Sequence, residues 1–233
     1  MIRTLYEDDV LLFVDKPPGI VVQRSHDPVE PVLFELASAA ATTPLFLLQR
    51  LDRGTSGVLF FTKQTAVNAR VTRMFEKRQI RKRYLALCHG RVEVRQSIDA
   101  PIARIGAIKF GVRENGRRAV THLEPVALSP AASLVAIRLE TGRTHQIRVH
   151  QGAIGHPLIG DWLYGERDAS RPMLHAAAIE MLHPVTREPL LISAPLPADF
   201  VEESIRRGID PASLTESGGT CSNEDTSTSN EVT

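Results

Sequence analysis

The most constraining feature of the chain is residues 47–61, where two apolar runs flank a short polar turn. The stretch reads Leu-Leu-Gln-Arg-Leu-Asp-Arg-Gly-Thr-Ser-Gly-Val-Leu-Phe-Phe. Short apolar runs bounded by turn residues predict buried strands, and Gly54 and Gly57 suit the turn between them. Asp52 stands in this turn between two arginines, and a nearby positive charge favours an ionised carboxylate. From these residues alone, Asp52 is either a turn residue that caps backbone N–H groups or a rigidly held functional carboxylate.

Length and composition indicate a soluble globular protein with a sizeable core. The chain has 233 residues, of which 42% are hydrophobic and 24% charged, and such values are typical of globular domains. No apolar run approaches the length of about 18 residues that a membrane-spanning helix needs, and no apolar signal region is present. The two cysteines, Cys88 and Cys221, allow neither a disulfide framework nor a zinc site. We therefore expect a cytoplasmic protein without membrane association.

Charge is distributed unevenly along the chain. The net charge is +1, but residues 209–233 hold five acids and no Lys or Arg, which leaves 28 basic and 22 acidic residues in the rest. This excess of positive charge favours a polyanionic partner. Residues 209–233 are also polar and poor in large apolar side chains, so we predict a disordered acidic tail there. The folded domain is expected to span residues 1–208.

Hydrophobic periodicity predicts a mixture of strands and helices. Ile2–Tyr6 and Val10–Val14 predict a hairpin, and the strand is expected to resume at residues 20–22 after a Pro-Pro-Gly break. Helices are predicted over residues 31–41, 64–77 and 197–207, and one is expected to begin near residue 143 or 144. Further strands are predicted over residues 83–87, 119–126 and 133–140, with a loop or loose hairpin over residues 101–118.

The predicted helix at residues 64–77 and the segment after it carry a marked excess of positive charge. Their cationic residues are Arg70, Arg73, Lys77, Arg78, Arg81, Lys82 and Arg83, with only Glu76 opposing them. Such a run is either a solvated helix face or a surface that follows the phosphates of a nucleic acid. The excess of one sign favours the phosphate-binding interpretation.

Three motifs connect the chain to a known family. The first is Arg-Leu-Asp-x-x-Thr-Ser-Gly at residues 50–57, the second is Lys-x-Tyr-x-Ala at residues 82–86, and the third is Gly-Arg-Thr-His-Gln-Ile-Arg-x-His at residues 142–150. Together they resemble the motifs of RluA-type pseudouridine synthases, and the resemblance extends to about residue 201. The first motif usually begins with His, and Gln49 takes that place here.

The resemblance implies an α/β (α+β) fold with a mixed, mostly antiparallel central sheet, flanking helices and an active-site cleft. It also implies an RNA pseudouridine synthase, an isomerase without a cofactor that converts specific uridines to pseudouridine in structured RNA. Ribosomal RNA is favoured slightly over transfer RNA. Only about fifty residues precede Asp52, so we expect no S4-like RNA-binding domain in front of it. The catalytic domain, residues 1–208, would then recognise RNA by itself, as a monomer.

The resemblance also implies roles for individual residues. Asp52 would be the nucleophile or base, Tyr84 would stack on the target base, and Arg148 would pair with Asp52. Attack at ribose C1′, attack at uracil C6 and removal of the C2′ proton all stay open. The expected substrate-binding residues are Arg50, Arg143, His145, Gln146, Leu174, Arg73 and Lys82.

Other functions fit the sequence less well. A non-catalytic RNA-binding module on the same fold is the alternative, but all three catalytic residues of the family are present. A hydrolytic glycosidase would need a second carboxylate, and none accompanies Asp52 in its motif. His145, His150 and His156 lack the four-residue spacing that places two metal ligands on one helical face. We therefore expect no metal site.

Overall fold

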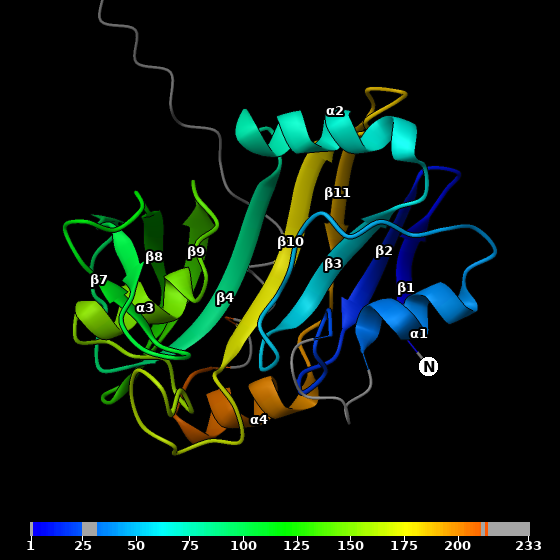
Figure 1. Cartoon of the computed structure of the whole chain (residues 1–233). Helices are drawn as coiled ribbons and strands as arrows, with labels where there is room; N and C mark the ends of the chain where they lie inside the picture. Colours follow the sequence, from blue (N-terminus) through cyan, green and yellow to red (C-terminus); the bar gives the residue numbers. More distant parts are fainter. Residues whose placement is uncertain (1, 25–31, 211–212, 214–233) are drawn as a thin grey trace, which may run out of the picture.

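The computed structural model describes residues 2–24, 32–210 and 213. Nine strands in these residues form one sheet, and the other two form a small separate hairpin (Figure 1). The strands of the sheet are β1 (Arg3–Glu7), β2 (Leu11–Lys16), β3 (Ser56–Thr62), β4 (Arg81–His89), β5 (Gln96–Asp99), β8 (Val120–Leu128), β9 (Ala132–Leu139), β10 (Leu174–Leu182) and β11 (Pro189–Ser193). The separate hairpin consists of β6 (Ile102–Arg104) and β7 (Phe110–Val112). The helices are α1 (Leu33–Ala40), α2 (Thr65–Glu76), α3 (Gln146–Ala153) and α4 (Ala198–Arg206).

The strand order is β1-β2-β3-β10-β4-β9-β8-β5, with β11 paired to β10. Every pairing in the sheet is antiparallel except that of β3 with β10, which is parallel. The predicted fold class, a mixed and mostly antiparallel sheet with flanking helices, is therefore confirmed. No helix among the described residues combines the length and apolar character needed to cross a membrane.

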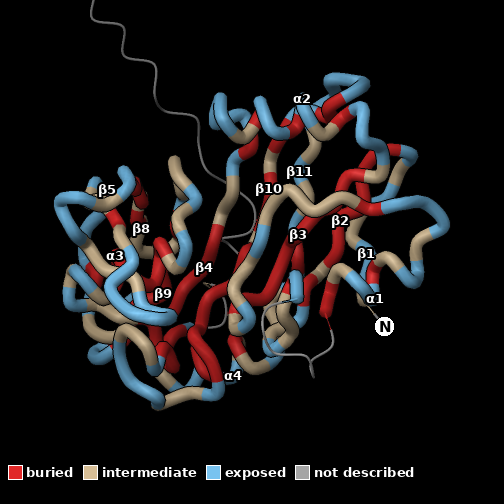
Figure 2. The backbone as a smooth tube through the Cα atoms, viewed as in Figure 1, coloured by how far each residue is buried: buried red, intermediate tan, exposed pale blue. Residues whose placement is uncertain are grey.

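Strand β3 is buried along its whole length (Figure 2), because apolar clusters that include helix residues pack on both of its faces. Val58 and Phe60 pack in one cluster with the apolar face of α2. Leu59 and Phe61 point to the opposite face and pack with Leu33 of α1. Alternate side chains of a strand project to opposite faces, so a continuous apolar run is what a strand covered on both sides requires. The prediction of a buried strand after the Asp52 turn is confirmed.

Two predicted strands are absent. Residues 47–51 have no strand structure, although Leu47 and Leu48 pack against two different core clusters. Residues 20–22 make only an isolated bridge, between Val21 and Val32. In both segments burial of apolar side chains explains the sequence pattern, but β-structure also needs a neighbouring strand with free backbone groups. The apolar run before Asp52 is therefore a partly buried, irregular segment and not a strand.

The other predicted elements are close to those found. The hairpin of β1 and β2, the strands at β4, β8 and β9, and the helices α1, α2 and α4 all lie within a few residues of their predicted positions. The helix of the third motif begins at Gln146, two or three residues later than expected, because His145 before it has a left-handed conformation with φ of 56°. The predicted loose hairpin is β6–β7. The predicted tail at residues 209–233 lies largely outside the described residues.

Close backbone contact joins β3 to β10 next to the Asp52 turn. Gly57 has φ of +109°, and a Cβ atom there would lie 2.2 Å from the carbonyl oxygen of Ala176. Only glycine allows this combination of backbone angle and contact. Beside it, Ser56 and the buried His175 bond to each other, with 3.0 Å between Oγ and Nδ1. The two strands that carry the turn and the far wall of the site are thereby locked in register.

His175 gives the fold an expected pH dependence. Burial lowers the pKa of His175 to about 4, from an ordinary value of 6.5. The unfolded chain then takes up a proton at higher pH than the native protein, so this stability is present above pH 6.5 and is lost as the pH falls towards 4. At pH 5 the loss amounts to about 2 kcal/mol. Urea unfolding at pH 7 and pH 5 measures it, and His175→Gln should show a smaller pH effect. Equal pH effects in both proteins would contradict the prediction.

Candidate active site

A cleft of about 750 Å³ lies where the irregular segment before Asp52, strand β4 and the start of α3 meet. Most of the residues predicted for the site line this cleft. They are Arg50, Asp52, Lys82, Tyr84, Arg143, His145, Gln146, Arg148 and Leu174. Segments separated by more than 100 residues in the chain thus form one hollow. The three catalytic residues implied by the motifs are together in it.

Asp52 and Arg148 are neighbours, but the main partner of Arg148 is another acid. Nη1 of Arg148 lies 3.4 Å from Oδ2 of Asp52. Nε and Nη2 of Arg148 donate to the two carboxylate oxygens of Asp161, each at 2.7 Å. The side chain of Asp161 is fully buried and that of Arg148 is 8% exposed, whereas Asp52 is 30% exposed. The two-point bond to Asp161 fixes the guanidinium plane, which leaves Nη1 directed at Asp52.

His145 and Tyr164 form the other side of this arrangement. The Tyr164 hydroxyl lies 2.9 Å from Nδ1 of His145 and accepts the backbone N–H of Phe110 at 3.0 Å. When the hydroxyl donates to Nδ1, the ring proton is on Nε2, which faces Oδ2 of Asp52 at 3.9 Å. The Arg148 guanidinium stacks over the Tyr164 ring at 5.2 Å. Burial lowers the pKa of His145, which favours the neutral imidazole.

Two buried cations hold the turn that follows Asp52. Nζ of Lys16 donates to the carbonyl oxygens of Pro17, Arg53 and Thr55 at 3.0, 3.1 and 2.7 Å. Arg171 donates from Nη1 to the carbonyl oxygen of Gly54 at 3.0 Å. These bonds satisfy backbone groups that the irregular turn leaves without a ladder partner. Asp52 is therefore presented on a fixed piece of backbone.

Tyr84 and Leu174 give the cleft an apolar wall. Tyr84 lies in β4 and Leu174 at the start of β10, and these two strands pair with each other. Both side chains are buried and pack in one cluster with Ile147 of α3. Burial, with a smaller contribution from the charge of Asp52, raises the pKa of the Tyr84 phenol. A neutral aromatic ring beside a carboxylate and a guanidinium is suited to hold a flat base.

Two of the predicted substrate-binding residues differ from the rest, because Arg73 lies outside the cleft and Gln146, although it lines the cleft, bonds to groups of the protein. Arg73 is exposed on α2 and does not line the cleft. The Gln146 amide is buried, and its Nε2 donates to the carbonyl of Val120 and to Oγ1 of Thr121, at 2.9 and 3.0 Å. Its Oε1 accepts the backbone N–H of Arg143. All these partners lie inside the protein, so Gln146 shapes the start of α3.

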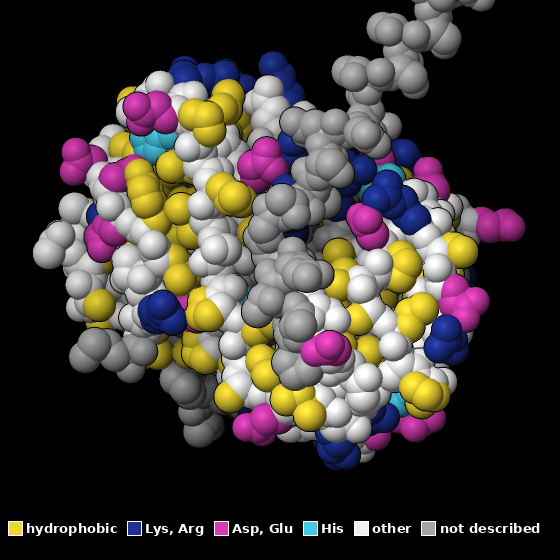
Figure 3. Space-filling model, turned by 180° about the vertical axis from the view of Figure 1, so that it is seen from behind, with side chains coloured by type: hydrophobic (Ala, Val, Ile, Leu, Met, Phe, Trp, Pro, Cys, Tyr) yellow, Lys and Arg dark blue, Asp and Glu magenta, His cyan; other side chains and the backbone are white. Residues whose placement is uncertain are grey.

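The basic surface around α2 is less free than the sequence indicates. Arg78 pairs with Glu140 at 2.6 Å, and Arg81 and Arg83 lie 3.2 and 3.7 Å from Glu180. Glu140 directly follows β9 and Glu180 lies in β10, so the charges within residues 64–83 alone do not reveal these partners. Burial lowers the pKa of Lys82 to about 8, and its Nζ lies 4.8 Å from the centre of the Phe75 ring. On the face turned away from Figure 1, visible acidic and basic side chains are mixed (Figure 3).

Comparison with known proteins identifies the family. The pattern of the family described as RNA pseudouridylate synthase matches residues 10–153. The chain belongs to this RNA pseudouridylate synthase family. Ribosomal large subunit pseudouridine synthase D of Xanthomonas campestris is 37% identical over 222 residues, which cover 85% of this chain and 67% of that protein. An uncharacterized RNA pseudouridine synthase of Zymomonas mobilis is 37% identical over 212 residues, or 86% of this chain and 96% of that protein.

Solved structures agree with this assignment. The human RNA pseudouridylate synthase domain containing 1 has a TM-score of 0.71 and 26% identity, covering 91% of this chain and 97% of that one. The resemblance to RluA-type enzymes is thus confirmed, and this pseudouridine synthase is an isomerase that acts on RNA.

Sequence reasoning missed four residues that build the site of this pseudouridine synthase. Asp161 and Tyr164 stand in the Gly-Asp-x-Leu-Tyr-Gly run of residues 160–165. The acid and the tyrosine in this run were the sequence signal that could have indicated a partner for Arg148. Lys16 and Arg171 hold backbone far away in the sequence, which no local pattern reveals. These residues hold the side chains and backbone around Asp52 in place.

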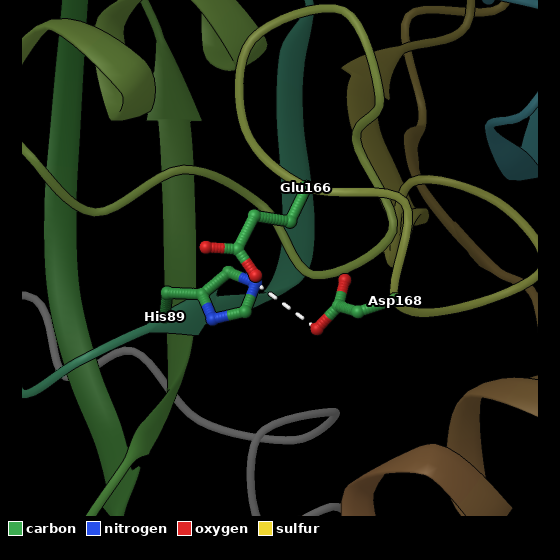
Figure 4. A group of neighbouring side chains, drawn as sticks. All are labelled: His89, Glu166 and Asp168. Atoms are coloured by element: carbon green, nitrogen blue, oxygen red, sulfur yellow. Dashed lines mark ion pairs between the residues drawn. The ribbon is translucent and has the colours of Figure 1, made fainter.

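A second group of titratable side chains lies away from the cleft. It consists of His89, Glu166 and Asp168 (Figure 4). Nε2 of His89 is 3.2 Å from Oδ2 of Asp168, which also pairs with the Arg207 guanidinium. Oδ1 of Asp168 accepts the N–H of Gly160 at 2.8 Å. Because a permanent cation already neutralises Asp168, we interpret this group as an anchor for the loop at residues 160–168.

Proposed function

We propose that this pseudouridine synthase isomerises uridines in ribosomal RNA, with Asp52 as the reacting carboxylate. The observation that carries the proposal is the placement of Asp52 in the cleft, 3.4 Å from the fixed guanidinium of Arg148 and beside the buried ring of Tyr84. The choice of ribosomal RNA is supported by several relatives at 33–37% identity that are named ribosomal large subunit pseudouridine synthase D.

The reaction needs a carboxylate and a site that retains the detached base. The bond from uracil N1 to ribose C1′ breaks, the base turns, C5 bonds to C1′, and the proton leaves C5 while N1 gains one. No atom or electron is lost, so no oxidant or hydrolytic water takes part. Asp52 serves as nucleophile or base, Tyr84 holds the face of the base, and Arg148 stabilises the negative charge at Asp52.

The target uridine has to leave its stack to reach this cleft. Enzymes that act on a base take it out of the helix. Arg50 is exposed at the mouth of the cleft, two residues before Asp52. Its guanidinium can fill the space that the extruded nucleotide leaves or contact the neighbouring phosphates.

A hydrolytic glycosidase is a poorer fit to the same cleft. Such an enzyme uses two carboxyl groups on either side of the scissile bond. The other acids that line the cleft in the described residues are Glu76 and Glu140. Glu140 is bound by His122 at 2.9 Å and by Arg78 at 2.6 Å, and Glu76 is exposed on α2. Neither is a counterpart to Asp52.

We further propose that the protein acts as a monomer in the cytoplasm. All the residues of the cleft come from one chain, so the site is complete without a second copy. Relatives that are named for the ribosomal large subunit support the cytoplasmic location, because ribosomal RNA would be the substrate there.

The decisive experiment maps pseudouridines in cells with and without the gene, by chemical labelling of total RNA. We expect one or a few sites in large-subunit ribosomal RNA to disappear, and purified protein to restore them in an unmodified transcript. Loss of sites in transfer RNA alone would show that transfer RNA, and not ribosomal RNA, is the substrate. An unchanged map together with an inactive purified protein would favour the non-catalytic RNA-binding module.

A further inference from the structure

A second cleft of about 1170 Å³ lies against the first. The two clefts share the segment of residues 48–52, together with Arg143, His145 and Arg148. The second cleft is bounded on its other side by residues 160–172 and by Ile108 at the tip of the β6–β7 hairpin. Asp52 therefore lies on a wall between two hollows, and the uridine site with Tyr84 uses only one of them.

Trp162 lines the second cleft and exposes a large aromatic surface. It is the only tryptophan of the chain and is 51% exposed, although a tryptophan ring is mostly apolar. Its loop is held firmly, because Arg148 binds Asp161 and Asp168 accepts the N–H of Gly160. Ile108 is 58% exposed, so a second apolar side chain borders the same cleft. An exposed aromatic ring on a fixed loop can stack on a flat ligand without first being ordered.

The charges around this cleft favour a polyanion. Arg50, Arg143 and Arg167 line it, and none of them forms an ion pair with an acid in the described residues. Among the residues that the structure describes, Asp52, at the shared wall, is the only acid that lines it. Guanidinium groups without an acid partner, of which Arg143 also donates from Nε to the carbonyl oxygen of Arg118 at 3.0 Å, match the phosphates of a single-stranded nucleotide, and the exposed aromatic ring beside them matches its base.

We propose that the second cleft binds a nucleotide of the substrate RNA next to the target uridine, with its unpaired base stacked on Trp162. The inference rests on the proposed function for the identity of the RNA. The target uridine would enter the first cleft while its neighbour enters the second, so that the RNA backbone crosses the wall at Asp52. Arg50, Arg143 and Arg167 would contact the phosphates. Stacking is tolerant of sequence because every base has a π-face.

Tryptophan fluorescence, excited selectively over the three tyrosines, reports on this contact directly, because Trp162 is the only tryptophan of the chain. An unmodified transcript of large-subunit ribosomal RNA is titrated into the wild-type protein and into Asp52→Asn. We expect quenching in both, with the same midpoint as filter binding. RNA binding without any change of fluorescence would overturn the proposal.

Two substitutions separate stacking from a structural role. Trp162→Ala should raise the Kd and the KM for the transcript about 10- to 100-fold, the usual effect of removing one stacked base contact. The value of kcat should change little, and Trp162→Phe should restore most of the affinity. Leu191→Ala, which removes another exposed apolar side chain (59% exposed, on β11), is the matched control and should behave as wild type.

The outcomes distinguish this proposal from the proposed function. A Trp162→Ala protein with wild-type Kd and KM overturns the subsite while leaving catalysis intact. Quenching by RNA in a wild-type protein that forms no pseudouridine supports the subsite and overturns the proposed function. Equal losses in Trp162→Ala and Trp162→Phe, with a lowered melting temperature, would show a structural role and also overturn the subsite.

Discussion

Asp52→Asn is expected to abolish pseudouridine formation while RNA binding stays close to wild type. The change replaces one carboxylate oxygen by an amide and keeps the shape of the side chain, so the reacting group is lost and the cleft is not. The rate should fall by at least about 10³-fold, as expected for removal of a group that acts directly in the reaction. Release of tritium from C5-labelled uridine in the transcript measures the rate, and filter binding measures the Kd.

The control for this experiment is another acid at the same cleft. Glu76 lines the cleft but is exposed on α2, so Glu76→Gln should retain wild-type turnover. Turnover by Asp52→Asn close to that of the wild type would remove Asp52 from the mechanism. The fold would then serve RNA binding alone.

Arg148→Ala is expected to have the second largest effect, and it should act on stability as well as on activity. The substitution leaves the fully buried Asp161 without its cation, and breaking a buried pair costs about 3–5 kcal/mol. It also removes the guanidinium that lies 3.4 Å from Asp52. Thermal unfolding should show a large fall in melting temperature, and pseudouridine formation should collapse.

A matched surface variant and a conservative one complete this experiment. Arg81 pairs with Glu180 at 3.2 Å on the surface, with 60% of its side chain exposed, and Arg81→Ala should cost under about 1 kcal/mol. Arg148→Lys keeps the charge but cannot bind both oxygens of Asp161 with a planar fork. We therefore expect this variant to have both a lower melting temperature and a lower rate of pseudouridine formation than the wild type. A stable Arg148→Ala protein with wild-type turnover would show that neither acid depends on Arg148.

Local patterns predicted which residues meet in the cleft better than they predicted the surroundings of those residues. Asp52, Tyr84 and Arg148 were each assigned from their own motif, and the structure places all three in one cleft. Those role assignments stay predictions until the substitutions are made. The motifs predict Asp52 as the partner of Arg148 and do not predict its pairing with Asp161, because hydrophobic periodicity does not show how the loop at residues 160–168 folds back onto α3.

The errors have a common physical origin. The run before Asp52 was predicted to be a strand from its apolar residues, but periodicity cannot report whether a free strand edge is available. The basic surface of α2 was predicted to be free, but Glu180 on β10 pairs with two of its arginines. In each case a partner distant in the sequence decides the outcome. Elements governed by their own residues, such as α2 and β4, were predicted correctly.

Strand β10 makes the order of folding matter for this enzyme. It is inserted between β3 and β4, and its contact with β3 joins Ser56 to His175, 119 positions later. While the chain is being synthesised, β3 and β4 have unpaired edges until β10 leaves the ribosome, and open edges favour association with other chains. Pairing over such a distance also slows folding. The nascent protein therefore cannot complete its cleft before Leu174, at the start of β10, has emerged.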